Sequence, residues 1–339
     1  CRHGKSLTSP CAIGSTTMGG IDIIQMTGRN FGPVAKDVIL RYGKRFVSSF
    51  NHTCTTVEGF NQSLIRCSTT SGTGKNHAFT VEVGGQFISG SDYFHYPAPS
   101  FKTGSLRILG SKCVGPTKCL QITKTGKGFV TAIGRSTIES VDLVELDGEN
   151  FGPDADSVTV TYGACPEEGD CSPNQYLPKF NCTTVFSPGI SNNHTRLQCT
   201  LASGIGVGLA FALTVDGQTA ISKDLITYPD PLLYSGTIQV VNNMTSTIPE
   251  YLVMAGPASS ALGRSTVGMD LIQLRGRNFG PLAHDIKVFY GPRENRFKYQ
   301  CSVVHLTGQW NHTTLHCAVE SGVGADHAFK IEAGVAPSE

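Results

Sequence analysis

Thr27-Gly28-Arg29-Asn30-Phe31-Gly32-Pro33 is the first of three near copies of one short phrase, and these copies decide how the chain is organised. The other two are Asp147-Gly148-Glu149-Asn150-Phe151-Gly152-Pro153 and Arg275-Gly276-Arg277-Asn278-Phe279-Gly280-Pro281. Counted from Gly28 to Gly148 and from Gly148 to Gly276, the copies lie 120 and 128 residues apart. This spacing is too long for a solenoid repeat of roughly 20 to 50 residues and suits one small domain per copy. The sequence therefore predicts a tandem array in which each repeat has its own core.

Other motifs recur in the same order around each phrase, and they mark strands and turns. A strand-like run of apolar and β-branched residues precedes each copy, at residues 21–26, 141–146 and 269–274. A Tyr-Gly pair follows each copy, at Tyr42, Tyr162 and Tyr290. A Ser-Gly-x-Gly turn then leads into another predicted strand, at residues 78–83, 210–215 and 328–331. Short strands separated by Gly, Pro and Asn turns predict an all-β fold made of β-sandwiches.

These ordered motifs resemble the IPT/TIG family, the immunoglobulin-like domains of plexins, related receptors and some transcription factors. In that family a strand runs into a Gly-x-Asn-Phe-Gly turn, and several antiparallel strands and a closing strand before a Pro follow. The resemblance covers nearly the whole chain and implies three tandem immunoglobulin-like (IPT/TIG) β-sandwich domains in a rod. We expect domain 1 at residues 1–97, a connector plus domain 2 at residues 98–229, and a connector plus domain 3 at residues 230–339.

The phrase itself is interpreted as a structural turn. Its first Gly is expected to take a positive φ, its Asn to tolerate left-handed backbone, and its Phe to plug the end of the sandwich. The residues in these roles are Gly28, Asn30 and Phe31, then Gly148, Asn150 and Phe151, then Gly276, Asn278 and Phe279.

Twelve cysteines indicate an oxidising compartment. An even count at repeated positions, without any Cys-x-x-Cys, favours disulfides over metal or redox sites. The pairs predicted in register are Cys54 with Cys67, Cys182 with Cys199 and Cys301 with Cys317. The local pairs predicted outside that register are Cys1 with Cys11, Cys113 with Cys119 and Cys165 with Cys171.

Asn-x-Ser/Thr sequons predict covalent N-linked glycans and point to the same compartment. The predicted glycosylation sites are Asn51, Asn61, Asn181, Asn193, Asn243 and Asn311. Three of them, Asn61, Asn193 and Asn311, occupy one register, each before the second cysteine of a repeated pair. Because a glycan keeps its surroundings hydrated, we expect the faces that pack between domains to lie elsewhere. The chain is predicted to be extracellular, either secreted or at a cell surface, and the sequence is interpreted as processed or fragmentary.

The connectors and the ends of the sequence carry two further expectations. Residues 104–109 match residues 236–241, and residues 119–122 match residues 251–254, so the connectors are predicted to hold strands and to stiffen the rod. Aligning Phe329 on Phe79 predicts that the third repeat lacks a closing strand within this sequence. Such an edge would accept an added strand and support head-to-tail assembly, and a window cut from a longer array is the alternative explanation.

Composition and motifs argue against several other functions. A net charge of +1 and 16% charged residues give no electrostatic footprint for nucleic acid, and no apolar run is long enough for a membrane helix, so no direct membrane insertion is expected. Residues 71–75 resemble part of a phosphate loop but lack its first Gly and the Ser or Thr after the Lys. No His, Cys, Asp or Glu cluster has metal spacing, and no nucleophile constellation recurs. We therefore predict no catalytic residue, no metal and no cofactor.

Two sets of polar residues share a register without forming such a constellation. Asp22, Asp142 and Asp270 begin the strand before the phrase, where a hydrogen-bonding role in a turn is favoured over calcium between domains. His77 and His327 are interpreted as packing residues, because the second repeat has an apolar side chain at that position.

Two functional hypotheses remain. The first is a secreted structural glycoprotein, non-catalytic, that forms a repeating subunit of an extracellular or cell-surface fibril or coat, with another copy of itself as partner. The second is an adhesion or receptor ectodomain that serves as a plexin-like stalk or ligand-binding module, with another cell-surface protein as partner.

Overall fold

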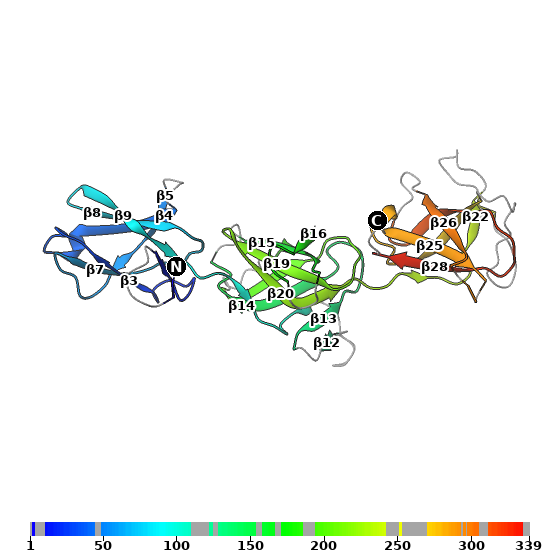
Figure 1. Ribbon diagram of the computed structural model, residues 1–339, viewed down its shortest axis with the longest axis horizontal. Helices are drawn as coiled ribbons and strands as arrows, with labels where there is room; N and C mark the ends of the chain where they lie inside the picture. The colour runs from blue at the N-terminus through cyan, green and yellow to red at the C-terminus, as the bar shows by residue number, and fades with distance from the viewer. Residues whose placement is uncertain are drawn as a thin grey trace.

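The computed structural model describes residues 2–3, 11–44, 49–109, 122–124, 128–153, 158–166, 171–185, 194–241, 251–252, 270–292, 294–295, 297–304 and 311–334. Figure 1 shows three bodies in a row, which we name lobes 1, 2 and 3 in chain order. Their main cores are three separate clusters of buried side chains. The described regular structure is all-β apart from two short 3-10 turns, as the turn-rich motifs predict.

Lobe 1 is a sandwich of a six-stranded and a three-stranded sheet. The large sheet has the order β1-β2-β9-β8-β4-β5 and the small one β3-β7-β6. The pairing is antiparallel except at β1 with β2 and β2 with β9. Its elements are β1 (Arg2–His3), β2 (Cys11–Ile13), β3 (Ile23–Thr27), η1 (Ala35–Asp37), β4 (Val38–Lys44), β5 (Ser49–Thr53), β6 (Thr55–Thr56), β7 (Leu64–Ser68), β8 (His77–Val83) and β9 (Gln86–His95).

Lobe 2 repeats this plan and adds strands from the connector that precedes it. One sheet has the order β12-β13-β20-β19-β15-β16, and the other has β10-β14-β18-β17 with β11 also paired to β14. Its elements are β10 (Ser100–Phe101), β11 (Arg107–Leu109), β12 (Ile122–Lys124), β13 (Val130–Ile133), β14 (Leu143–Glu149), β15 (Val158–Ala164), β16 (Leu177–Asn181), β17 (Thr183–Thr184), β18 (Arg196–Thr200), β19 (Leu209–Val215) and β20 (Gln218–Thr227).

Lobe 3 joins the equivalent strands into one wrapped sheet of order β23-β22-β24-β27-β26-β25-β28, with β21 also paired to β24. Among the described residues β28 pairs only with β25, whereas β8 and β19 each pair on both sides. Its elements are β21 (Leu232–Leu233), β22 (Gln239–Val241), β23 (Tyr251–Leu252), β24 (Leu271–Arg277), η3 (Ala283–Asp285), β25 (Ile286–Gly291), β26 (Tyr299–Val304), β27 (Thr314–Val319) and β28 (Ala328–Ala333).

In lobes 1 and 2 a disulfide lies where the chain passes from one sheet to the other, and in lobe 3 it lies on β26, which pairs with both β25 and β27. Cys54 stands between β5, which belongs to the large sheet, and β6, which belongs to the small one. It bonds Cys67 of β7, and both are buried. The corresponding bonds in the other lobes are Cys182–Cys199 and Cys301–Cys317. A bond at the crossing strand holds the two faces of the sandwich together.

The structure also forms the local bond Cys165–Cys171. The predicted pair Cys113 with Cys119 lies outside the described residues, and so does Cys1 of the pair Cys1 with Cys11.

The Gly-x-Asn-Phe-Gly phrase folds differently from one part of its prediction. The Asn residues are left-handed, with φ of 65° at Asn30, 61° at Asn150 and 63° at Asn278. The predicted positive φ at the first Gly of each phrase is wrong, because Gly28, Gly148 and Gly276 have no positive φ. The Gly that follows Phe has the positive φ instead, with values of 81°, 87° and 75°. The first Gly is required for space instead, because a Cβ at Gly28, Gly148 or Gly276 would overlap the ring of the buried Phe three residues on.

Candidate joints between the lobes

The two junctions between lobes are built from the same contact. The Oγ1 atom of Thr17 in lobe 1 lies 2.6 Å from Nδ1 of His194 in lobe 2. The Oγ1 atom of Thr137 in lobe 2 lies 2.7 Å from Nδ1 of His312 in lobe 3. Both threonines are fully buried, at 0% exposure. Because neither hydroxyl reaches water, the imidazole of the next lobe supplies its hydrogen-bond partner.

Two aspartates, the half-buried Asp22 and the buried Asp142, hold the loops that carry these threonines. The Asp22 carboxylate accepts hydrogen bonds from the backbone N–H of Ser15 at 2.9 Å and from its hydroxyl. The Asp142 carboxylate accepts hydrogen bonds from the backbone N–H of Arg135 at 2.7 Å and from its Nε at 2.6 Å. The register shared by these aspartates thus reflects a positioning role in the turn, and the described residues hold no group of three possible metal ligands.

Each joint also uses the Ser-Gly-x-Gly turn, which we call the plug loop: residues 71–74, 203–206 and 321–324. A plug loop is tied to its threonine loop by one backbone bond, from Gly72 N–H to Thr17 O and from Gly204 N–H to Thr137 O, each 3.1 Å. This bond joins the two loops into one surface at the end of the lobe.

A pair of buried tyrosines supports the plug loop from inside. In lobe 1 the hydroxyls of Tyr42 and Tyr96 lie 2.6 Å apart, and that of Tyr96 donates to Thr70 O. In lobe 2 Tyr228 donates in the same way to Ala202 O, beside Tyr162. Burial raises the pKa of Tyr162 to about 12, so its hydroxyl stays protonated at neutral pH. The tyrosines of the Tyr-Gly pairs and those that precede Pro97 and Pro229 thus share one role, which is to fix the surface that enters the joint.

The facing surface of the next lobe is the Asn-Phe-Gly turn, which we call the socket. Asn150 Nδ2 donates to Ala98 O at 3.4 Å, and Asn278 Nδ2 donates to Asp230 O at 3.0 Å, so each Asn binds the linker that enters its own lobe. The Gly after Phe receives the plug loop: a Cβ on Gly152 would lie 2.5 Å from Thr73 Cγ2. A Cβ on Gly280 would lie 2.5 Å from Ile205 Cγ2. Any larger residue at these two positions would push the lobes apart.

The joints differ in the residues around this shared centre. In the first joint Lys44 of lobe 1 forms an ion pair with Asp216 of lobe 2, and Gln218 donates to Tyr96 O at 3.3 Å. In the second joint Ile205 of lobe 2 is 2% exposed and belongs to the core cluster of lobe 3. The first joint is therefore the more polar, and the second is the more apolar.

The imidazoles in the joints are half-buried. Desolvation lowers the pKa of His194 and of His312 below the ordinary value of 6.5. Acid conditions therefore oppose docking at both junctions.

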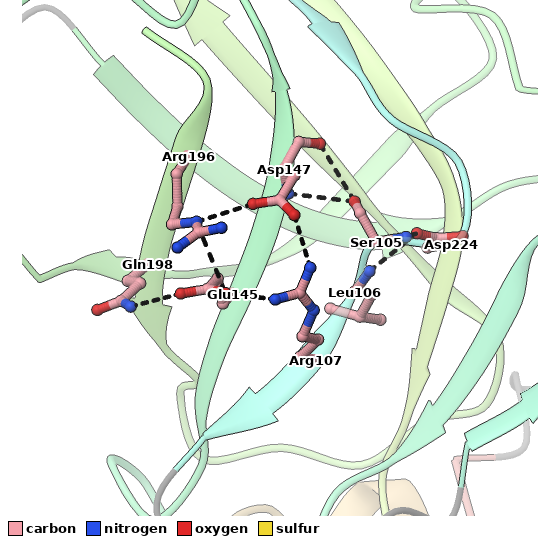
Figure 2. Close-up of polar contacts among 8 residues, drawn as sticks. All are labelled: Ser105, Leu106, Arg107, Glu145, Asp147, Arg196, Gln198 and Asp224. Atoms are coloured by element: carbon pink, nitrogen blue, oxygen red, sulfur yellow. Dashed lines mark hydrogen bonds and ion pairs between the residues drawn. The ribbon is translucent and has the colours of Figure 1, made fainter. Parts of the chain in front are cut away.

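A second set of contacts, centred on Asp224 and here called the connector clamp, fixes the connector to lobe 2. The carboxylate of Asp224 on β20 is 1% exposed and accepts four backbone hydrogen bonds. The donors are the N–H groups of Gly104 at 2.8 Å, Ser105 at 2.8 Å, Leu106 at 3.0 Å and Val130 at 3.1 Å. Figure 2 shows Asp224 beside Ser105 and Leu106, which lie just before β11. The equivalent residue in lobe 1, Asp92, is exposed.

Charged side chains lie beside this clamp, where β11, β14 and β18 run together (Figure 2). Arg107 donates to Glu145 at 3.1 Å and to Asp147 at 2.7 Å. Arg196 donates to Asp147 at 2.8 Å from the opposite side. Two arginines thus balance two carboxylates, and the connector strand β11 is bound to the sheet by side chains as well as by its ladder.

The described sequon asparagines are all exposed, as glycan attachment requires: Asn51, Asn61, Asn181 and Asn311. Asn193 and Asn243 lie outside the described residues. The expectation that packing faces lie away from these sites is wrong. The middle residue of the sequon at Asn311 is His312, which contacts lobe 2, and His194 holds the same place in the sequon at Asn193. A glycan on Asn311 would therefore stand at the rim of a joint.

The remaining residues singled out in the sequence have packing roles. His77 is 2% exposed, and its Nε2 lies 2.8 Å from Thr73 O, so it braces the plug loop of lobe 1. His327 packs against Tyr290 and Tyr299 in lobe 3. No helix in the described part of the chain is long and apolar enough to cross a bilayer.

The Thr–His contact was missed at the level of sequence, although a signal for it exists. The threonines follow a Gly-Ser-Thr or Gly-Arg-Ser motif in the same register, and both histidines occupy the middle position of a sequon. His52 occupies a sequon as well but contacts Tyr42 within lobe 1, so the sequon alone does not identify a joint.

Comparisons with known proteins identify no family. No protein-family model matches the chain, and no curated protein matches it by sequence. Among solved structures, the plexin A4 extracellular region is 12% identical with a TM-score of 0.24, over 98% of this chain and 23% of that one. The I9–I11 tandem from titin is 8% identical with a TM-score of 0.23, over 96% and 92% of the two chains. The Escherichia coli adhesin FdeC is 11% identical with a TM-score of 0.21, over 91% and 83%.

Such low similarity carries no argument about function. The fold rests on the strands described above, which make the chain an all-β array of the immunoglobulin-like kind.

Proposed function

We propose that this chain is a stiff segment of a secreted structural glycoprotein of the IPT/TIG type, which builds an extracellular or cell-surface fibril or coat and has no catalytic role. The observation that carries the proposal is the repetition of one joint at both junctions. A chain that only displayed separate binding modules would not need the same Thr–His contact, plug loop and socket twice.

Disulfides and sequons support an extracellular location. Four bonded pairs are rare in the reducing cytosol, and exposed sequon asparagines are open to glycosylation on the secretory route. The three lobes would thus carry their sugars outward while the loops at their ends set the direction of the rod.

The connectors support stiffness. Between lobes 1 and 2 the connector is bound by the four backbone hydrogen bonds to Asp224, and β11 joins the sheet of lobe 2. Between lobes 2 and 3, β22 joins β24 at the equivalent place. A flexible tether would leave such backbone groups to water.

Electron microscopy of the native glycoprotein tests this function. Fibres or a coat with a fixed axial repeat would support it, and isolated rods bound to a cell-surface protein would favour the rival role as an adhesion or receptor ectodomain. Mass spectrometry of the same material should find glycans on the sequons and disulfide-linked peptides, and reduced cysteines without glycans would overturn both roles.

A further inference from the structure

At the two outer ends of the array, the socket of lobe 1 and the plug loop of lobe 3 face no neighbouring lobe among the described residues, and Gln62 stands in lobe 1 where His194 and His312 stand in the joints. At one end is the socket of lobe 1, beside Gly32. At the other is the plug loop of lobe 3, which carries Val323. We propose that these ends bind each other between copies, so that the plug loop of lobe 3 in one molecule enters the socket of lobe 1 in a second copy. The inference rests on the proposed function and specifies the surface through which its fibril would form.

The socket of lobe 1 is open where its counterparts are filled. Gly32 is half-buried, whereas Gly152 and Gly280 are buried beneath the plug loops of the preceding lobes. Val83 beside it is half-buried, while its counterpart Val215 is 2% exposed. The space corresponds to a cavity of about 460 Å³ that Gly32, Val34 and Val83 help to line.

The plug loop of lobe 3 shows the complementary difference. Val323 is 65% exposed, whereas Ile205 at the same position in lobe 2 is 2% exposed because it sits in the socket of lobe 3. The loop is nevertheless held in shape, since Tyr299 Oη donates to Val323 O at 3.2 Å and Tyr290 Oη to Glu320 O at 2.9 Å. Val323 is therefore an exposed apolar side chain on a loop whose conformation is already fixed, which lowers the entropy cost of binding.

The residues at the two ends are complementary in shape in the same way as the residues of the second joint. There the β-branched Ile205 covers Gly280, and Gly206 lies against Gly334, whose own Cβ would stand 3.3 Å from Gly206 Cα. Between copies Val323 would take the place of Ile205, and Gly324 would lie against Gly84, the residue of lobe 1 that corresponds to Gly334. All four positions that meet are small or β-branched, so the backbones can approach as closely as they do in the joint.

A glycan on lobe 1 would leave room for this contact, as judged from the equivalent sequon of lobe 3. Asn61 is the sequon at the rim of the open socket, and Asn311 stands at the same place beside the filled socket of lobe 3. Because this contact is head-to-tail, it does not close on itself, and it would give open filaments rather than dimers.

Sedimentation of the full glycosylated chain over a wide concentration range tests the inference. The wild-type chain should gain mass without limit as concentration rises. Val83→Glu should block the socket and Val323→Glu the plug, and each variant alone should associate at least about tenfold more weakly. Val34→Glu gives a second socket variant in case Val83→Glu disturbs the core. Phe87→Glu is the matched control, because Phe87 is 78% exposed on the same lobe outside the cavity, and it should associate like wild type.

Mixing the two blocked chains gives the decisive result. The Val83→Glu chain keeps its plug and the Val323→Glu chain keeps its socket, so an equimolar mixture should form a dimer and stop there. A wild-type chain that stays monomeric at every concentration would overturn the inference. So would single variants that associate as wild type does, or a mixture that does not pair.

The failure of this inference can be told apart from the failure of the proposed function. If native fibres persist in a Val83→Glu protein, the inferred contact between copies is wrong and the proposed function is still supported. If the native glycoprotein forms no fibre or coat although the chain associates as described, the proposed function is wrong and the inferred contact is still supported.

Discussion

The hydroxyl of Thr137 lies 2.7 Å from Nδ1 of His312, across the junction of lobes 2 and 3, and Thr17 stands in the same relation to His194 at 2.6 Å. The residues of each pair are 175 and 177 positions apart in the chain. Two junctions with different surroundings therefore share one polar contact at their centre.

Replacing these threonines by valine should loosen the joints. The variant Thr137→Val leaves Nδ1 of His312 without its partner in a half-buried site, at a cost to docking of about 1 kcal/mol. Hydrogen exchange of residues 311–314 should speed up while the core strands of both lobes stay protected. Thr55→Val is the matched control, since Thr55 is exposed within lobe 1 and is not one of the residues described in either joint. Equal exchange in Thr137→Val and wild type would show that the contact does not hold the lobes.

Acid should weaken the joints before it unfolds the lobes. Desolvation lowers the pKa of His194 and His312 when they are docked, so the undocked state binds more protons as the pH falls through 6.5. Docking is thus fully stable above that value and is progressively lost below it. Small-angle scattering between pH 7.5 and pH 5 should show a rod that becomes more flexible, and a His194→Gln, His312→Gln chain should lose that pH dependence. A wild-type profile that stays constant over the range would contradict the account.

The connector clamp should depend on the charge of Asp224. Asp224→Asn places an amide N–H group among four backbone donors, and the loss of these charge-assisted bonds should destabilise lobe 2 by about 2 to 3 kcal/mol. Exchange at residues 104–106 and 130 should report the change directly. The matched control is Asp92→Asn, the equivalent substitution in lobe 1, where the carboxylate is exposed and little effect is expected. Similar losses in the two variants would mean that the clamp contributes nothing specific.

The first Gly of each phrase should be intolerant of a methyl group, and unequally so. In Gly148→Ala and Gly276→Ala the new Cβ would overlap a backbone carbonyl, of Ser100 and Leu232, as well as the Phe ring. In Gly28→Ala the nearest atoms belong to the ring of Phe31 alone, which has some freedom to shift. We expect Gly28→Ala to be the mildest of the three, and thermal unfolding of the three variants checks the order. A reversed order would mean that backbone conformation, rather than space, explains these glycines.

Removing one cysteine of the Cys182–Cys199 disulfide should destabilise lobe 2 more than removing both. Replacing both Cys182 and Cys199 by serine should cost about 3 kcal/mol, as loop-closure entropy predicts for a separation of 17 residues. Cys182→Ser alone should cost more, because the remaining thiol of Cys199 is free to mispair. Secretion yield and the unfolding midpoint of lobe 2 measure both effects, and an unchanged midpoint in the single variant would count against the bond.

The sequence predicted the fold where a motif acts within one lobe. The alternating runs became β3, β14 and β24, and the Phe of each phrase is buried, because strand pattern and core packing are local properties of a repeat. Gly28 was interpreted through φ because glycine's lack of a Cβ has two uses, and only coordinates reveal that space decides here.

The joints could not be predicted from the same patterns. His312 follows a sequon asparagine, and its position suggests a hydrated surface until the neighbouring lobe is in view. Its partner Thr137 belongs to another repeat, and no local periodicity connects the two residues. Asp224 and Asp92 hold equivalent positions, yet one is buried and the other exposed, because burial depends on which connector lies over the strand.

Single-particle electron microscopy of the glycosylated chain tests the central claim most directly, by measuring the angle between neighbouring lobes in each molecule. The account predicts one narrow distribution at each junction, which widens in the Thr17→Val, Thr137→Val chain. Broad distributions at both junctions of the wild-type chain would contradict it, because lobes that turn freely cannot share a docked joint.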